Sequence, residues 1–232
     1  MSGILASLAA IGIFLVGLLA RLGVFLLVLA ALLVPALLLA GAAKALRAAA
    51  GWAKGYRSAD ALRFRKGLRY APGHTWLRPE GQVLRVGLDD LAQKLLPWAV
   101  AVDLPRPGRR VAQGERVARV CCGSHEAHLA APVAGTVVAV NPRLARHPSL
   151  LKSRCYGAGW LLAIEPEGAA WKALPGGEAA RQWLAEEGRR LARFYEAQLG
   201  IASADGGDLT SPPAVLLGEP QWNALMREFL RT

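Results

Sequence analysis

An almost unbroken apolar run opens the chain and is the strongest pattern in it. Residues 3–43 are apolar except for Ser7 and Arg21. At a helical rise of about 1.5 Å per residue, this run is roughly twice as long as one crossing of a ~30 Å bilayer core needs. We therefore predict a transmembrane segment over 1–43, with one confident span at 22–43.

The first part of the run, residues 3–20, fits two arrangements. It is either a second membrane span that turns back at residues 20–23 or a helix that lies at the membrane interface. Both place Arg21 near the lipid headgroups and avoid the cost of a charge at mid-membrane, roughly 3 kcal/mol or more. We favour the hairpin of two spans. A cleaved signal peptide is disfavoured, because its apolar core is only about 7–15 residues long.

Basic residues crowd directly behind the apolar run. Residues 44–69 carry eight Lys and Arg side chains and one acid, and they predict a basic juxtamembrane helix and linker. Much of the chain's net charge of +11 lies here, which indicates contact with membrane lipids and no nucleic acid partner. Since flanks rich in Lys and Arg stay in the cytoplasm, we predict the inner (cytoplasmic) membrane, with the soluble domain facing the cytoplasm. The expected membrane-surface residues are Lys44, Arg47, Lys54 and Arg57.

From Tyr70 onward, short runs with β character alternate with Pro and Gly. This texture predicts a compact, mainly β domain with flanking helices, of sandwich or barrel type. The expected strands are 83–86, 99–104, 116–121, 135–140 and 160–164.

Helical spacing of apolar residues appears mainly in the C-terminal extension, residues 178–232. It predicts amphipathic helices over 178–199 and 221–230, and Asp89 or Asp90 is expected to cap a further short helix that runs through Leu96. Glu186 and Glu187 are assigned to a solvated helix face. With only three cysteines in the chain, a disulfide framework is excluded.

Five short motifs follow one another along residues 70–184. They are His74-Thr75-Trp76, then VGLDDLAQ at 86–93, VDLP at 102–105, APVAGTVVAVN at 131–141 and YGAGWL at 156–161. In this order they resemble the H protein of the glycine cleavage system, a lipoyl-carrier family. The resemblance implies a barrel-sandwich hybrid, in which two small sheets enclose one core and a hairpin tip presents a lipoylated lysine.

The lysine of that hairpin is missing here. Counted back from Ala131-Pro132, its position falls on Ser124. No lysine lies between Lys94 and Lys152, so a small shift in the alignment does not supply one. Because a hydroxyl cannot form the lipoyl amide, we expect a non-lipoylated scaffold with no cofactor and no catalytic residue.

Four potential metal ligands gather around the same position: Cys121, Cys122, His125 and His128. Thiolates and imidazoles suit zinc or another thiophilic metal, although adjacent residues of a strand point to opposite faces. A carrier or a metal or redox module is therefore the alternative interpretation, beside the simpler one of a core cysteine and exposed histidines. His74 is assigned to packing and hydrogen bonding before Trp76.

The leading functional hypothesis is a non-catalytic, membrane-anchored accessory subunit. Its H-protein-like domain would dock onto protein subunits of a larger membrane-associated complex, redox and photosynthetic complexes included. The last helix would offer the partner Trp222, Met226, Phe229 and Leu230, as helices that fill a partner's groove do. A transport adaptor is a weaker alternative, because the chain has no long heptad run.

Overall fold

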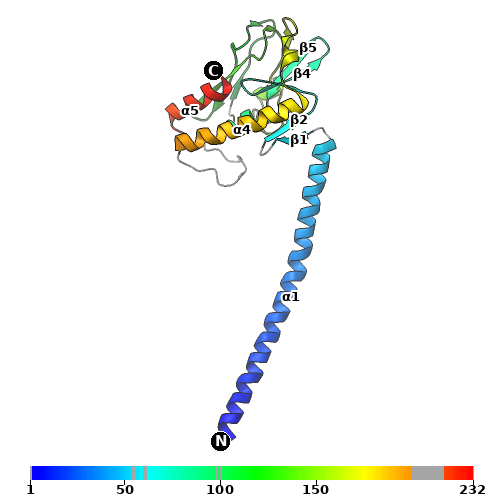
Figure 1. Cartoon of the computed structure of the whole chain (residues 1–232), viewed down its shortest axis with the longest axis vertical. Helices are drawn as coiled ribbons and strands as arrows, with labels where there is room; N and C mark the ends of the chain where they lie inside the picture. Colours follow the sequence, from blue (N-terminus) through cyan, green and yellow to red (C-terminus); the bar gives the residue numbers. More distant parts are fainter. Residues whose placement is uncertain are drawn as a thin grey trace. The chain divides into compact units, whose positions relative to one another are not determined.

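A computed structural model describes residues 2–53, 56–59, 62–97, 99, 101–199 and 217–231. The chain divides into two compact units, Met1–Lys54 and Gly55–Thr232. The first unit consists of the helix α1, and the second holds the sheets and the remaining helices (Figure 1).

Helix α1 (Ser2–Ala53) is continuous over 52 residues and passes through Arg21 and Pro35 without a break. The predicted turn at residues 20–23 is therefore wrong: arginine is a good helix former, and a single glycine costs only about 1 kcal/mol inside a helix. Within the described residues, Gly17–Leu46 is the one segment long and apolar enough to cross a membrane, judged by length and composition alone. A signal sequence near an N-terminus has the same two properties.

The basic segment 44–69 is only partly helical. Helix α1 ends at Ala53, and strands β1 (Tyr56–Ala59) and β2 (Leu62–Arg65) then form an antiparallel hairpin in place of the expected helix and linker. Burial alternates along β2, where Leu62 and Phe64 point into the core between exposed or half-buried arginines. Among the expected lipid contacts, Lys44 is exposed, Lys54 lies outside the described residues, and the side chains of Arg47 and Arg57 are likewise not described.

Two further sheets build the second unit. The larger has the strand order β3-β4-β5-β11-β10-β7 and the smaller the order β6-β8-β9. The first sheet comprises β3 (Arg69–Ala71), β4 (Thr75–Glu80), β5 (Val83–Leu88), β7 (Arg110–Val111), β10 (Gly135–Val140) and β11 (Leu162–Pro166). The second comprises β6 (Ala101–Asp103), β8 (Arg116–Cys122) and β9 (His125–Ala130).

Both sheets enclose one core, which confirms the barrel-sandwich-like architecture. Buried side chains of the larger sheet, such as Leu77 and Ile164, belong to the same apolar cluster as Val120 and Leu129 of the smaller one. The five predicted strands are observed as β5, β6, β8, β10 and β11, with ends displaced by at most two residues.

Helices flank the sheets. Helix α4 (Gly177–Leu199) contacts β1, β2 and β3 (Figure 1), and the short α5 (Glu219–Leu225) continues into a π-helical turn, η4 (Met226–Leu230), against β9. The Asp89 side chain caps α2 (Asp90–Leu95) by accepting a bond from the backbone N–H of Ala92 at 2.9 Å. The remaining short helices are η1 (Pro142–Ala145), α3 (Leu150–Ser153) and η2 (Ala170–Ala173).

Gly87 illustrates how closely the core is packed. A Cβ at this position would lie 2.4 Å from the Cζ2 atom of the fully buried Trp76. We expect Gly87→Ala to lower the free energy of unfolding by about 1–3 kcal/mol, since overpacking displaces the ring or the strand. Urea denaturation of the full chain in a non-ionic detergent measures this. The control is Gly157→Ala, whose Cβ would meet nothing closer than 3.8 Å, and equal losses in the two variants would contradict the packing argument.

Candidate functional site

The β8–β9 hairpin ends in a two-residue turn, Gly123-Ser124, flanked by the register pair Cys122 and His125. Gly123 has φ +68°, which the first position of a type II′ turn requires and which glycine adopts without strain. Both turn residues are exposed. The structure therefore places Ser124 at the hairpin tip, at the location expected for the modified residue.

The two cysteines lie on opposite faces of this hairpin. Cys122 is buried in the core, and burial, together with the neighbouring Cys121, raises the pKa of its thiol to about 11. Such a thiol stays protonated at neutral pH and is a poor nucleophile and metal ligand. Cys121 is half-buried on the other face, with its Sγ 4.0 Å from a carboxylate oxygen of Glu126.

The histidines are equally divided. His125 shares a register pair with Cys122, whereas His128 pairs with Arg119 on the face of Cys121. Among the residues that the structure describes, no group of three His, Cys, Asp or Glu side chains is placed to hold a metal ion. The geometry thus gives the metal interpretation of these four side chains no support.

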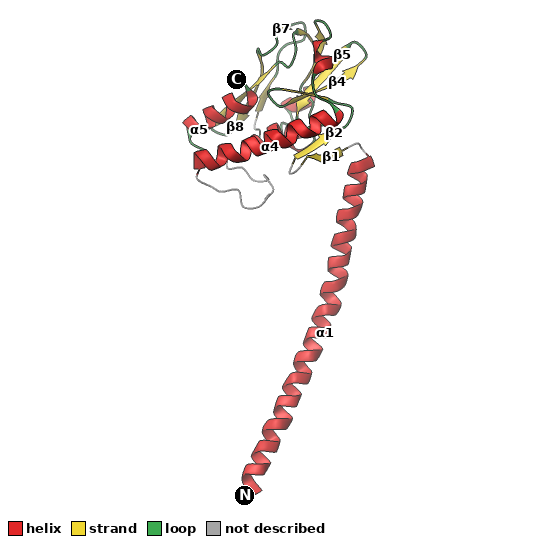
Figure 2. Ribbon diagram, in the orientation of Figure 1, coloured by secondary structure: helices red, strands yellow, loops and turns green. Residues whose placement is uncertain are grey.

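Helix α5 lies beside β8 of the hairpin (Figure 2), and its Trp222 contacts the hairpin directly. The Trp222 ring stacks on His125 with centroids 4.8 Å apart and an interplanar angle of 16°. Its Nε1–H donates to the backbone carbonyl of Glu126 at 2.9 Å, and His125 Nδ1 lies 2.9 Å from the Glu219 carboxylate. One flank of the hairpin is therefore covered by the chain's own C-terminal helix.

This contact corrects the predicted partner-binding surface. Trp222, Met226, Phe229 and Leu230 are each at most 4% exposed, and they belong to the core of the same chain. The predicted amphipathic helix is confirmed, but its apolar face packs against the same chain and not against a partner. These four side chains do not form an exposed docking face.

A buried polar cluster links the second unit's core to its C-terminal helices. His74 is 1% exposed, and its ring nitrogens lie 2.9 Å from an Asp89 carboxylate oxygen and 3.3 Å from one of Glu187. The ring also stacks on Trp183, with centroids 5.1 Å apart. Burial lowers the His74 pKa, but Asp89 and Glu187 raise it by more than burial lowers it. The resulting pKa is about 9.

The same cluster extends to η4. Arg190 donates to Glu187 at 2.8 Å and to Glu228 at 2.6 Å, and its guanidinium lies over the Phe229 ring. Glu187 is therefore a half-buried member of an ion-pair network, contrary to the solvated helix face expected for it. His74 has the packing and hydrogen-bonding role that we predicted.

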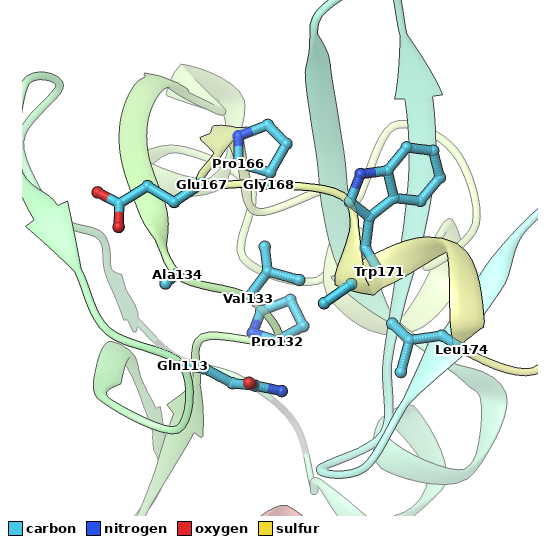
Figure 3. A pocket seen from close by; sticks show the side chains of 10 residues that line it. Gln113, Pro132, Val133, Ala134, Pro166, Glu167, Gly168, Trp171 and Leu174 are labelled. Atoms are coloured by element: carbon cyan, nitrogen blue, oxygen red, sulfur yellow. The ribbon is translucent and has the colours of Figure 1, made fainter.

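A separate small hollow of about 100 Å³ lies at the ends of β10 and β11 (Figure 3). Pro132, Val133, Trp171 and Leu174 give it an apolar lining, and the Glu167 carboxylate points away from Trp171 (Figure 3). Glu167 is the one titratable side chain in this lining, so the hollow holds no pair of groups for acid–base or nucleophilic chemistry.

Taken with the exposed turn, the two-sheet core defines a carrier-type domain, and comparisons with known proteins identify its family. The family model described as glycine cleavage H-protein matches residues 68–187. The probable glycine cleavage system H protein of Aeropyrum pernix is 43% identical over 103 residues, covering 44% of this chain and 72% of the relative. The glycine cleavage system H protein of Thermus thermophilus is 41% identical over 97 residues, covering 42% of this chain and 76% of the relative.

The chain belongs to the glycine cleavage H-protein family, whose domain acts as a lipoyl carrier and not as a catalyst. Among solved structures, an H protein from Mycobacterium marinum matches with a TM-score of 0.46 and 28% sequence identity, covering 54% of this chain and 99% of that chain. The long apolar helix and the C-terminal helix α5 lie outside the residues that the family model matches.

Proposed function

We propose that this chain is a non-catalytic H-protein-like subunit that carries no lipoate and docks onto a larger membrane-associated complex. The observation that carries the proposal is Ser124 at the exposed tip of an otherwise complete carrier hairpin. Lipoate attaches through an amide, which needs an amine, and the hairpin has no lysine. The family's scaffold is retained without its swinging arm.

The N-terminal helix supports attachment to a membrane. Gly17–Leu46 has the length and composition of a membrane span, and Lys44 lies exposed near its end. The basic residues that follow favour a cytoplasmic soluble domain and contact with anionic lipid headgroups. In this proposal the inner (cytoplasmic) membrane holds the domain close to its partner subunits.

The decisive experiment is purification of the natural chain from its own cells in a mild detergent, followed by intact-mass and native-mass measurement. We expect the bare chain mass of 24.7 kDa, with no lipoyl or metal adduct, in a particle that contains other subunits. A lipoyl adduct or bound zinc, copper or iron would favour the carrier or metal module instead. A chain that migrates alone under all mild conditions would refute docking.

A substitution tests whether the amine is the feature that the hairpin lacks. We expect Ser124→Lys to accept lipoate from a lipoate–protein ligase, because residue 124 lies exposed in the two-residue turn of the β8–β9 hairpin. The natural chain stays unmodified under the same conditions. Intact mass before and after the reaction measures this, and His147→Lys, on an exposed loop outside the hairpin, is the matched control. Equal modification of the two variants would show that the ligase does not prefer a lysine at the hairpin tip.

A further inference from the structure

A hollow of about 410 Å³ runs between the β8–β9 hairpin and the C-terminal helices. This is within the range of about 300–1,000 Å³ that small-molecule sites occupy. We call it the hairpin groove. The hairpin lines it with Arg116, Ser124, Glu126 and His128, and the helices line it with Glu219, Trp222, Asn223, Met226 and Arg227.

Both carboxylates of the hairpin groove already have a partner within the chain. Glu126 forms an ion pair with Arg119 at 2.9 Å, and Glu219 lies 2.9 Å from the His125 ring. Arg119 and His125 are not among the residues that line the groove. Each carboxylate therefore has its partner outside the lining of the groove, and that partner for Glu126 is the cation Arg119.

Two arginines of the groove have no such partner. Across the described parts of the chain, neither Arg116 nor Arg227 makes a side-chain hydrogen bond or an ion pair with another residue. A guanidinium presents paired donors that match the oxygens of a carboxylate or a phosphate. The hairpin groove thus has an excess of uncommitted positive charge, beside the hydroxyl of Ser124.

The helical wall of this groove comes from residues beyond the family match, which ends at residue 187. Trp222 and Met226 are buried, so the wall is fixed in place and does not depend on a loop. We propose that the hairpin groove binds a small organic anion through a carboxylate or phosphate group held by Arg116 and Arg227. This inference is independent of the docking role, since ligand binding and subunit association are measured separately.

The test is calorimetric titration of the full chain in a non-ionic detergent, at constant ionic strength. The probes are pyrophosphate, succinate and, as a neutral counterpart of succinate, succinamide. We expect saturable binding of at least one of the two anions and none of succinamide. Arg116→Ala and Arg227→Ala are each expected to weaken binding about tenfold, the effect of losing roughly 1.4 kcal/mol of interaction.

The matched control is Arg110→Ala. Arg110 is also an exposed arginine, but it pairs with Glu167 away from the groove, and its loss is expected to change the affinity less than about twofold. Arg227→Gln repeats the test with a long polar side chain in place, so that only the positive charge is removed. The proposal is overturned if neither anion binds saturably, or if the Arg116→Ala, Arg227→Ala double variant binds like the natural chain. Preference for pyrophosphate or for succinate distinguishes a phosphate from a carboxylate ligand.

Discussion

Replacing His74 by asparagine is expected to lower the free energy of unfolding by about 3 kcal/mol at pH 6 and by much less at pH 10. The folded chain holds the His74 pKa at about 9, above the value of about 6.5 that an unfolded chain gives it. That difference corresponds to roughly 3 kcal/mol, at ~1.4 kcal/mol per pH unit. Asparagine is chosen because residue 74 has φ +57°, which Asn tolerates better than most residues.

The direction of the pH dependence follows from proton binding. Below pH ~6.5 the imidazolium forms in both states, and its ion pairs with Asp89 and Glu187 contribute fully to stability. As the pH rises through about 9, the folded ring loses its proton and this contribution disappears. The natural chain should therefore lose stability across this range. The variant has no imidazole at position 74, so it lacks this pH-dependent contribution.

Urea denaturation of the full chain in non-ionic detergent, at a series of pH values, measures the difference between the two proteins. His147→Asn is the control, because His147 lies exposed on a loop. A stability difference that stays constant from pH 6 to pH 10 would show that His74 acts through packing on Trp183 and not through charge. A stability difference that increases with pH would contradict the assignment of a proton to the folded His74 ring.

The sequence predicted the parts of the fold that depend on local signals. Glycines and prolines punctuate the strands, and the resemblance carried by the five motifs implied a hairpin with Ser124 at its tip. Ser124 could be placed because Ala131-Pro132 stands a few residues away, and a short count carries little error. These features needed no knowledge of distant contacts.

The parts that the sequence did not predict are long-range contacts. An amphipathic pattern over 221–230 states that one face is buried, but not against what. Trp222 meets Glu126 across 96 positions of the chain, and Glu187 meets His74 across 113. Neither contact leaves a periodic signal. The β1–β2 hairpin was missed for a different reason, since its basic residues concealed a short alternation of buried side chains.

Trp222→Ala is expected to release the C-terminal segment from the hairpin, with a loss of about 3–5 kcal/mol from the docking of α5 and η4. The indole is 1% exposed, stacks on His125 and donates to the Glu126 carbonyl. Its removal leaves a cavity and an unsatisfied acceptor at once. Amide hydrogen exchange over residues 219–230 should rise about a hundredfold or more, because segments held by few contacts open locally.

Trp222→Phe separates the two causes. Phenylalanine keeps an aromatic ring against His125 but has no N–H donor for Glu126, so a smaller loss of about 1 kcal/mol is expected. Trp171→Ala is the matched control, since that half-buried indole lies at the other, apolar hollow and its loss should leave exchange over 219–230 unchanged. If Trp222→Ala also left this exchange unchanged, the helix would be held by Arg190 and its ion pair with Glu228. The hairpin groove would then persist without its central aromatic wall.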